Sequence, residues 1–499
     1  MRQPTLNSPT ELADFSRARY TAIISDLHLC EEEPTHAKYP LWKKYKSREF
    51  FFDDVFRNFL AHLKERAGGS PIELILNGDI FDFDSVMTLP ESPPYRLSWI
   101  ERRRGLHPQK DKSEFKIKRI LDHHQDWVAA LREFVIEGGR VIFVIGNHDL
   151  ELHWNRVQDA VLAALNLPEG ADARVRFNEW FYISNADTLI EHGNQYDPYC
   201  MAQDPINPYV LRFNRMEVRV PFGNLATRYL INGMGFFNPH IDTNYLMTPT
   251  EYVKFFFRYM IKAQPLLMID WLWGSVVALF QSFIDRLRPS LRDPLTIEDR
   301  VQWIAAKANA TPRMVRELQE LFVPPAASYP LIIMRELWLD RAFLVVGILL
   351  LILQLSLALS TIKGTSMFWM LIPFLPLLIF LPFFIFYSRS VSSLVVESKE
   401  PREEILAMAG QIAKVNRIVY GHTHIIRHEV IGPIEHLNPG TWSPAFTDVE
   451  CKRPIGMKSF VWIAPGVDGS RYSQLLAFKN SRSFPAFAAP KRTVEETPS

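Results

Sequence analysis

The stretch YTAIISDLHL, residues 20–29, is a short apolar run that ends in an aspartate and a histidine. A run of this length that stops at polar residues predicts a buried β-strand. Further strands are expected at 72–77, 140–146 and 187–193, and helices at 47–66 and 113–137. This alternation of strands and helices predicts an α/β domain whose first part is residues 19–200.

The end of each expected strand carries a polar block. The blocks are SDLHL (25–29), NGDIFD (77–82), GNHD (146–149), EHGN (191–194) and, after a long intervening segment, GHTH (421–424). Side chains alternate along an extended chain, so residues i and i+2 point the same way, about 6.5 Å apart. We therefore expect Asp26 and His28 to reach one metal ion. His422 and His424 would each reach one ion of a pair held about 3.5–4 Å apart.

Three further residues are candidates to complete this metal site. Asp79 stands at a strand end, where its carboxylate can bridge two ions. Asn147 and His192 offer an amide oxygen and an imidazole to the second ion. Oxygen and nitrogen ligands without sulfur suit Mn²⁺, Fe or Zn²⁺, and the sequence does not choose among these metals.

The ordered series of blocks resembles the calcineurin-like metallophosphoesterase superfamily. The pattern of that superfamily is D-x-H, G-D-x-x-D, G-N-H-D/E, x-H-G and G-H-x-H, and all five parts are present in this order. The match covers roughly 19–200 and 415–480. The resemblance implies a four-layer αββα sandwich of two mixed sheets. It also implies a metal-dependent hydrolase of phosphodiesters, phosphomonoesters or pyrophosphates.

The resemblance assigns a role to each of these residues. One ion would be held by Asp26, His28, Asp79 and His424, and the other by Asp79, Asn147, His192 and His422. A hydroxide that bridges the two ions would attack phosphorus in line. The catalytic residues would be Asp79, which holds both ions, and His148, which would donate a proton to the leaving-group oxygen or stabilise its charge. Asp82 and Asp149 would orient the ligands by hydrogen bonds, although helix capping and turn formation explain these two equally well.

Two uncharged apolar runs, residues 342–359 and 367–387, separate GHTH from the other blocks. As helices they would be about 27 and 32 Å long, close to the roughly 30 Å core of a bilayer. We expect a two-helix transmembrane hairpin over 342–387; two buried core helices are the alternative. Basic residues flank the hairpin on its outer ends, so both soluble parts are expected on the cytoplasmic side.

The position of the hairpin restricts the topology of the intervening segment. The ligands on its two sides can meet only if the chain crosses the membrane an even number of times. The apolar stretch 265–284 is therefore expected to be an interfacial helix, or a buried core helix, within a helical cap over 201–340. The second part of the catalytic domain is expected at 400–480, and a disordered tail at 481–499.

The layout of the insert resembles that of UDP-diacylglucosamine pyrophosphohydrolases, in which an insert between the same two blocks forms a lipid-chain pocket. Those enzymes carry arginine where His148 stands, so the resemblance supports a lipid-linked phosphorylated substrate and membrane lipids as partners rather than that particular substrate. Arg102, Arg103 and Arg104 are candidates to bind an anionic headgroup. An ordinary solvated charged segment is the alternative for these arginines.

Composition and charge bear on the remaining alternatives. The cysteines Cys30, Cys200 and Cys451 are too few and too scattered for a disulfide framework, which favours a reducing compartment. No apolar segment that would indicate a cleavable signal peptide precedes residue 20. A nuclease of the same superfamily should have a broad basic face, whereas the net charge is +1, so nucleic acid is not an expected partner. A non-catalytic membrane scaffold usually lacks a ligand, and here none is missing. The oligomeric state is not fixed by the sequence.

Overall fold

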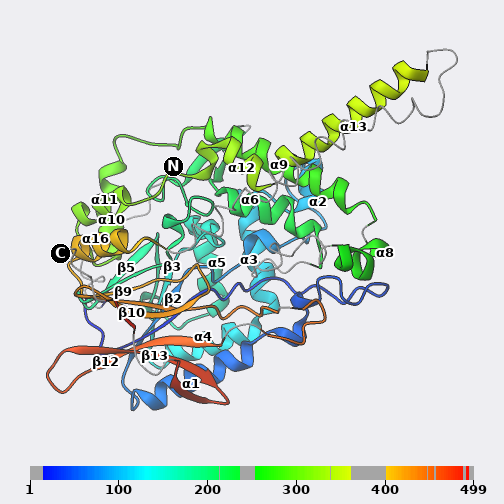
Figure 1. The fold of residues 1–499 in the computed structure, drawn as a ribbon. Helices are drawn as coiled ribbons and strands as arrows, with labels where there is room; N and C mark the ends of the chain where they lie inside the picture. Colours follow the sequence, from blue (N-terminus) through cyan, green and yellow to red (C-terminus); the bar gives the residue numbers. More distant parts are fainter. Residues whose placement is uncertain are drawn as a thin grey trace.

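The computed structural model describes residues 15–212, 214–236, 253–263, 265–337, 339–360, 401–446, 448–454, 457–486 and 491–493. Over these residues the chain forms an α/β fold with two mixed sheets, so the expected fold class is confirmed (Figure 1). The second apolar run, 367–387, lies outside the described residues, and the two-helix hairpin therefore stays a prediction.

The seven-stranded sheet has the strand order β14-β13-β12-β1-β2-β3-β4. Its strands are β1 (Tyr20–Ile24), β2 (Ile72–Asn77), β3 (Arg140–Val144), β4 (Val175–Asn178), β12 (Ser459–Pro465), β13 (Arg471–Lys479) and β14 (Arg482–Pro485). The first four strands are parallel, and their burial on both faces agrees with their continuous apolar runs. Strand β12 pairs antiparallel with β1, with Val461 opposite Ile23, so the two parts of the chain share this sheet.

The six-stranded sheet has the strand order β15-β10-β11-β9-β6-β5. Its strands are β5 (Phe181–Ser184), β6 (Thr188–Glu191), β9 (Arg417–Val419), β10 (Ile426–Ile431), β11 (Ile434–Pro439) and β15 (Lys491–Thr493). Strand β9 runs parallel to both of its neighbours, with Ile418 opposite Leu189 of β6 and His436 of β11. This pairing joins the segment before the insert to the segment after it.

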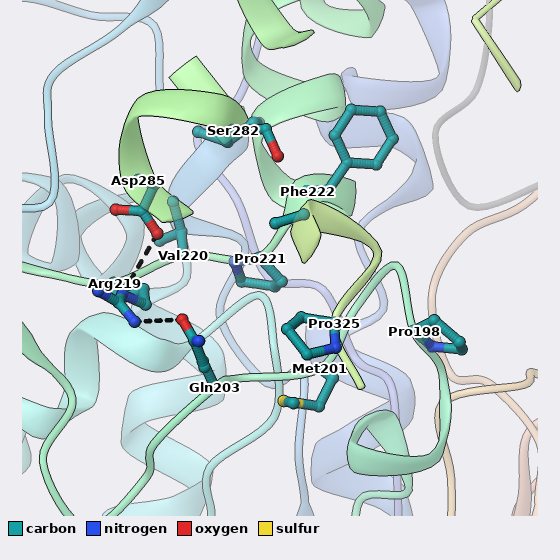
Figure 2. Close-up of a pocket in the computed structure, with 12 residues that line it drawn as sticks. Pro198, Met201, Gln203, Arg219, Val220, Pro221, Phe222, Ser282, Asp285 and Pro325 are labelled. Carbon is teal, nitrogen blue, oxygen red and sulfur yellow. Dashed lines mark hydrogen bonds and ion pairs between the residues drawn. The ribbon is translucent and has the colours of Figure 1, made fainter. Parts of the chain in front are cut away.

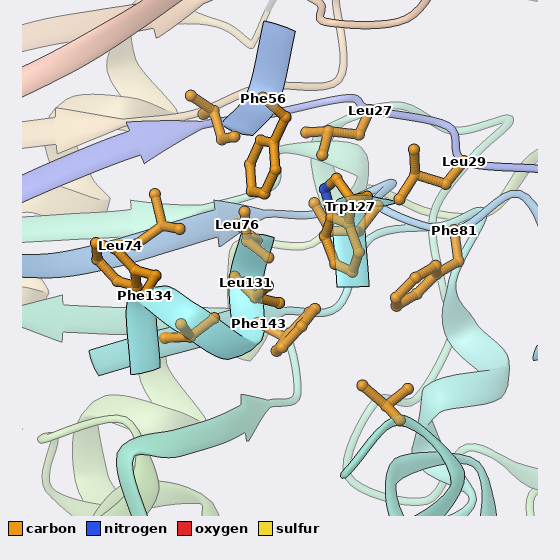
Figure 3. Packing of buried hydrophobic residues seen from close by; sticks show 14 of the residues in the cluster. Leu27, Leu29, Phe56, Leu74, Leu76, Phe81, Trp127, Leu131, Phe134 and Phe143 are labelled. Atoms are coloured by element: carbon orange, nitrogen blue, oxygen red, sulfur yellow. The ribbon is translucent and has the colours of Figure 1, made fainter. Parts of the chain in front are cut away.

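Three apolar clusters separate four layers of structure. Helices α1 (Asp53–Arg66), α3 (Lys110–His123), α4 (Gln125–Ile136) and α5 (Asn155–Leu165) cover the outer face of the seven-stranded sheet. Figure 3 shows Phe56 and Trp127 of this layer beside Leu76 of the sheet. Ile75 and Val419 belong to the cluster between the two sheets. Helices α10 (Ile297–Lys307), α11 (Pro312–Glu320) and α16 (Glu403–Ala413) pack against the six-stranded sheet.

The remaining described α-helices and β-strands belong to the segment between the two halves of the sandwich, apart from α2 (Trp99–Arg104), which lies close to that segment. They are β7 (Tyr209–Arg212), β8 (Arg215–Val218), α6 (Phe222–Tyr229), α8 (Ile261–Ala263), α9 (Leu267–Arg286), α12 (Pro330–Glu336) and α13 (Leu339–Ser360). Helix α13 projects away from the body of the protein (Figure 1). Among the described residues it is the one helix long and apolar enough to cross a membrane, over the 21 residues Leu339–Leu359.

The structure corrects several expected boundaries. Residues 297–320, expected within a separate cap, form α10 and α11, because Val301, Ile304, Val315 and Leu318 are buried against the sandwich. The helix expected at 47–66 begins at Asp53. The helix expected at 113–137 is two helices that meet at His124. The buried imidazole of His124 contacts Asp53 Oδ1 at 2.8 Å and the carbonyl oxygen of Cys30 at 3.0 Å. These contacts stabilise the interruption between the two helices.

The prediction of a disordered tail from residue 481 is also partly wrong. Arg482–Pro485 forms β14 and pairs with β13, with Phe484 opposite Ala477. Lys491–Thr493 forms β15 and pairs with β10. A polar composition had predicted disorder, but backbone hydrogen bonds at a sheet edge do not require apolar side chains.

Candidate metal centre

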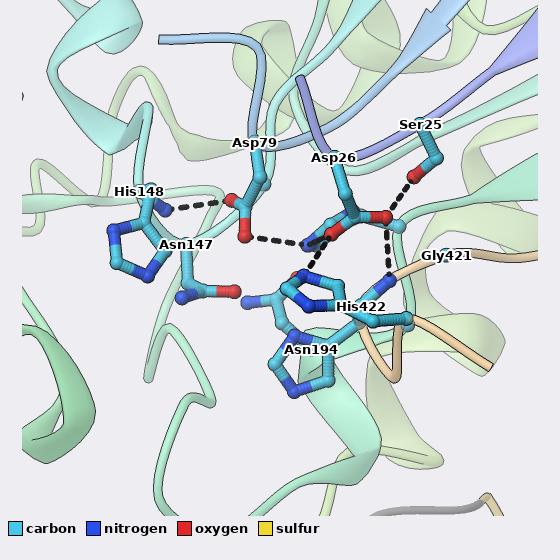
Figure 4. A network of polar contacts seen from close by, with 12 residues as sticks. Ser25, Asp26, Asp79, Asn147, His148, Asn194, Gly421 and His422 are labelled. Carbon is cyan, nitrogen blue, oxygen red and sulfur yellow. Dashed lines mark hydrogen bonds and ion pairs between the residues drawn. The ribbon is translucent and has the colours of Figure 1, made fainter. Parts of the chain in front are cut away.

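The five polar blocks meet where strands β1, β2, β3, β6 and β9 end (Figure 4). The first three of these strands belong to one sheet and the last two belong to the other. Ligands at the carboxyl ends of strands are typical of open α/β sheets. The centre therefore lies between the edges of the two sheets, and both halves of the chain are required to build it.

Two groups made up entirely of the predicted metal ligands form there. In the first group, the ligand atoms of Asp26, His28 and His424 lie within 4.8 Å of one another. His28 Nε2 is 3.3 Å from His424 Nε2, and His424 Nε2 is 3.2 Å from Asp26 Oδ1. Two imidazole nitrogens and a carboxylate oxygen that converge in this way can bind one divalent cation.

The second group consists of Asp79, His192 and His422, whose ligand atoms also lie within 4.8 Å of one another. His192 Nε2 is 3.1 Å from Asp79 Oδ2. Asp79 also lies within 4.0 Å of His28 Nε2 through the same oxygen, so its carboxylate stands between the two groups. This is the position that a carboxylate shared by two cations requires.

Asn147 shows most directly that the centre fits a cation. Its side-chain oxygen Oδ1 is buried and has no hydrogen-bond partner among the residues that the structure describes. A buried carbonyl oxygen without a partner costs about 1–3 kcal/mol, so such atoms are rare in folded proteins. A cation bound by this oxygen would remove that cost. The donor set of carboxylate, amide and imidazole groups suits Mn²⁺, Fe or Zn²⁺, and the structure does not distinguish these metals.

The tautomers of two histidines are set by their neighbours. His192 Nδ1 lies 3.0 Å from the carbonyl oxygen of Asn77, which can only accept a hydrogen bond, so Nδ1 carries the proton. The lone pair of His192 Nε2 is therefore directed at the centre. His422 Nε2 lies 3.0 Å from Asp197 Oδ2, which leaves Nδ1 of His422 to bind a cation. Asp197 was missed in the sequence, because a single acidic residue five positions after His192 carries no specific signal.

The backbone of the ligand residues differs from the extended geometry that their spacing suggested. Asp26, His28, Asp79, His422 and His424 have φ angles of 56°, 50°, 52°, 67° and 60°. These left-handed values are uncommon for residues other than glycine and are often found at functional sites. The Asp26 N–H donates to the Gly78 carbonyl at 3.1 Å and the His28 N–H donates to the Asp79 carbonyl at 2.8 Å. The ligand side chains nevertheless converge, because the loops that carry them hydrogen-bond to one another.

Three glycines make this close packing possible. A Cβ at Gly78 would lie 2.3 Å from the His192 ring, and a Cβ at Gly421 would lie 2.0 Å from Ser25 Oγ. A Cβ at Gly146 would lie 2.4 Å from Asp79 Oδ1. Each motif glycine therefore leaves the space that a side chain from another motif occupies.

His148 adjoins both ligand groups, since one of its ring nitrogens lies within 4.8 Å of ligand atoms of His28 and Asp79. Its backbone N–H donates to Asp79 Oδ1 at 2.7 Å, and its Nδ1 is 3.3 Å from Asp82 Oδ1. Burial alone would lower the pKa of His148, but the carboxylates of Asp79, Asp82 and Asp84 raise it to about 10. A protonated imidazole in this position can donate a proton or stabilise negative charge.

Asp82 and Asp149 make the turn and cap hydrogen bonds that the sequence left open as their alternative role. Asp82 accepts from the Ser85 N–H at 3.1 Å and so caps a short helical turn. Asp149 accepts from the Gly146 N–H at 2.5 Å and from the Ile80 N–H at 2.8 Å. Burial and the nearby Asp79 carboxylate raise the pKa of Asp149 to about 7. These hydrogen bonds fix the loops that carry Asp79 and Asn147.

The three arginines proposed from sequence lie on helix α2, beside the insert. Arg102 is exposed, and Arg103 is 3.6 Å from Asp270 of α9. Arg104 is buried, with its guanidinium against Gly233. The structure thus places them next to helices of the insert, and a role in substrate binding stays a prediction.

Comparison with known proteins shows which protein family part of this chain is similar to. The model of the calcineurin-like phosphoesterase family matches residues 20–258. No curated protein matches the sequence. Among solved structures, Vacuolar Protein Sorting 29 from Cryptosporidium parvum is 23% identical over 17% of this chain and 42% of its own, with a TM-score of 0.14. Vps29 from Entamoeba histolytica is 25% identical over 16% of this chain and 48% of its own, with a TM-score of 0.11. The match thus covers less than half the length of each of these two structures.

Proposed function

Residues 20–258 of this chain belong to the calcineurin-like phosphoesterase family, and from this premise we propose that the protein is a membrane-anchored, metal-dependent hydrolase of a phosphoester or pyrophosphate. The observation that carries the proposal is the convergence of seven ligand-type residues on one centre, where the buried Asn147 Oδ1 lacks a hydrogen-bond partner among the described residues. These residues are Asp26, His28, Asp79, Asn147, His192, His422 and His424.

The chemistry follows from the positions of the side chains. Two divalent cations, when bound, activate water as a nucleophile and stabilise the negative charge that develops on phosphoryl oxygens. Asp79 stands between the two ligand groups and would set the separation of the cations. His148 is held beside Asp79 by its backbone hydrogen bond and would supply the proton that the leaving-group oxygen requires.

The insert supports the membrane part of the proposal. Helix α13 exposes Phe343, Leu349, Leu353 and Leu357, each at least half exposed. Helix α9 exposes Ile269, Trp273, Val276, Phe280 and Phe283 at a spacing that places them on one face, and the exposed Leu287 follows directly after the helix. Trp273 meets the exposed Trp99 of α2 at a ring separation of 6.0 Å, and tryptophan is enriched at membrane interfaces. This second apolar face agrees with an interfacial α9.

We infer a lipid-linked substrate from the same features. The anchor and the apolar face of α9 lie in the segment inserted between His192 and His422, so the membrane and the candidate metal centre are connected by one segment of chain. A substrate that carries an acyl or prenyl chain in the bilayer would reach the centre from that side. The cytoplasmic side is proposed for both halves of the domain because of the basic residues that flank the apolar runs.

Purified protein in detergent tests this function. The wild-type protein and the variants Asp79→Asn and His424→Ala are incubated with Mn²⁺ and a diester, a monoester, a lipid pyrophosphate or single-stranded DNA. We expect the wild-type protein to hydrolyse at least one of the first three substrates and each variant to lose at least a hundredfold in rate. Equal background rates for all three proteins would refute the proposal. Turnover restricted to DNA would instead identify a nuclease.

A further inference from the structure

Helix α6 of the insert contacts the loop that carries Asn147. The side chain of Asn224 in α6 is 1% exposed, and its Nδ2 donates to the backbone carbonyl of Asn147 at 2.7 Å. The same amide nitrogen donates to Asp84 Oδ2 at 2.5 Å. A residue of the insert therefore bonds directly to the backbone of a candidate metal ligand.

Asp84 strengthens this connection. Arg228, one turn after Asn224 in α6, donates to Asp84 Oδ1 at 2.5 Å and lies 3.6 Å from Glu151. The side chain of Asn232, just beyond α6, donates to the Asp84 carbonyl at 2.7 Å. Arg228 and Asp84 are both almost fully buried. A buried ion pair with several hydrogen bonds has one favourable geometry, so α6 is fixed relative to the loop that carries Asp84.

Asp84 also faces the candidate catalytic histidine. The carboxylates of Asp82 and Asp84 and a ring nitrogen of His148 lie within 4.8 Å of one another. Arg228 and Asn224 bind the Asp84 carboxylate from the insert side, so they fix its position next to His148. Two neighbouring residues of the centre, Asn147 and His148, thus depend on contacts with one short helix.

Helix α6 is itself held by α9. A Cβ at Gly274 of α9 would lie 2.6 Å from the carbonyl oxygen of Tyr229, so the two helices are in close contact. Near the other end of α9, Asp285 pairs with Arg219 at 3.2 Å (Figure 2). Gln203 accepts a hydrogen bond from the same arginine (Figure 2). The helix with the exposed apolar face is therefore in close contact with the helix that hydrogen-bonds to Asn147.

We propose that Asn224 is a positioning residue for the metal ligand Asn147, and that the insert thereby sets the affinity of the centre for its cation. The proposal rests on the proposed function only in that it requires the cation site. Asn224 holds the backbone of Asn147 so that Oδ1, which has no hydrogen-bond partner within the described part of the chain, would stay available to a cation. Loss of a hydrogen bond that orients a ligand typically weakens metal affinity by 10- to 100-fold.

Titration with Mn²⁺ by isothermal calorimetry tests the proposal on the full chain in detergent. Asn224→Ala removes the hydrogen bond to Asn147. Asn224→Asp keeps the shape but removes both N–H donors and places a carboxylate against Asp84. Asn207→Ala is the matched control, because Asn207 is an equally buried asparagine of the insert whose side chain bonds to Asp204 instead. Thermal melting shows whether each variant is folded.

We expect Asn224→Ala to bind Mn²⁺ about tenfold more weakly than the wild-type protein, Asn224→Asp to bind still more weakly, and Asn207→Ala to bind as the wild type does. Hydrolysis of a phosphodiester by Asn224→Ala should recover when Mn²⁺ is raised to saturation, which a general loss of structure would not allow. A folded Asn224→Asp protein with wild-type Mn²⁺ affinity would overturn the proposal. Mn²⁺ binding without turnover by the wild-type protein would refute the proposed function alone, because the calorimetric comparison would still decide the role of Asn224.

Discussion

The substitution Gly146→Ala tests the packing of the candidate metal centre with a single added carbon. The new Cβ would lie 2.4 Å from Asp79 Oδ1, 2.6 Å from the Asp79 backbone nitrogen and 2.9 Å from His192 Cδ2. The Asp79 side chain could rotate away, but its backbone nitrogen could not. Ordinary van der Waals contact begins at 3.4 Å, so the Asp79 backbone must move by about 0.8 Å. This is several times the roughly 0.2 Å tolerance of a metal–ligand distance.

We expect this displacement to weaken cation binding by the amount that overpacking usually costs. About 1–3 kcal/mol corresponds to a roughly 5- to 150-fold weaker affinity. Isothermal calorimetry with Mn²⁺ measures this, together with the rate of phosphodiester hydrolysis. Gly139→Ala is the matched control, because its Cβ would lie 2.3 Å from the ring of Phe134 and Gly139 is at the opposite end of strand β3 from Gly146. That variant should lose stability but keep its Mn²⁺ affinity. A folded Gly146→Ala protein that binds Mn²⁺ as tightly as the wild type would refute the packing argument.

Three further outcomes are expected. His148→Ala should lower kcat by about 10²- to 10⁴-fold and leave Mn²⁺ stoichiometry unchanged, as measured by turnover and metal analysis; a loss of bound metal would instead make His148 a ligand. Replacing Leu350 and Leu353 in α13 by arginine should release the protein from membranes at high pH, as sedimentation would show, because each charge costs about 2.5–3.5 kcal/mol at the centre of a membrane helix; unchanged sedimentation would argue against a span. Burial lowers the pKa of Lys458 from 10.5 to about 7, so the unfolded chain binds more protons between these values and stability should rise with pH from 7 to 10.5. Lys458→Met should therefore raise the Tm at pH 7 and flatten its pH dependence, and an unchanged melting profile would contradict this.

The positions of the ligands along the chain could be predicted because a buried parallel strand has a clear signal. An apolar run such as Tyr20–Ile24, followed at once by polar residues, identifies both the strand and the edge at which the next residues lie. The strands of the sheets run parallel near the centre, so blocks far apart in sequence, such as those of Asp79 and His422, could be expected to meet. The two mixed sheets followed from the resemblance rather than from periodicity.

Other features depend on contacts between distant residues, and no local pattern reports them. The left-handed backbone of Asp26 is stabilised by a hydrogen bond to Gly78, so the spacing of D-x-H by itself suggested the wrong local geometry. The break at His124 depends on Asp53 and Cys30, whereas the surrounding residues have a continuous helical pattern. Asn224 lies 77 positions from Asn147 in an otherwise unremarkable helix. Polar contacts of this kind are visible only when the chain is folded.

The order of the blocks along the chain has a consequence for biosynthesis. Translation proceeds from Asp26 to His192 and then through the whole insert, including the apolar helix α13, before His422 and His424 are made. Strand β12, which pairs with the central strand β1, is made later still. A nascent chain thus lacks two of the seven candidate ligands until the apolar helix has left the ribosome. The candidate centre can therefore be completed only after α13 has been synthesised.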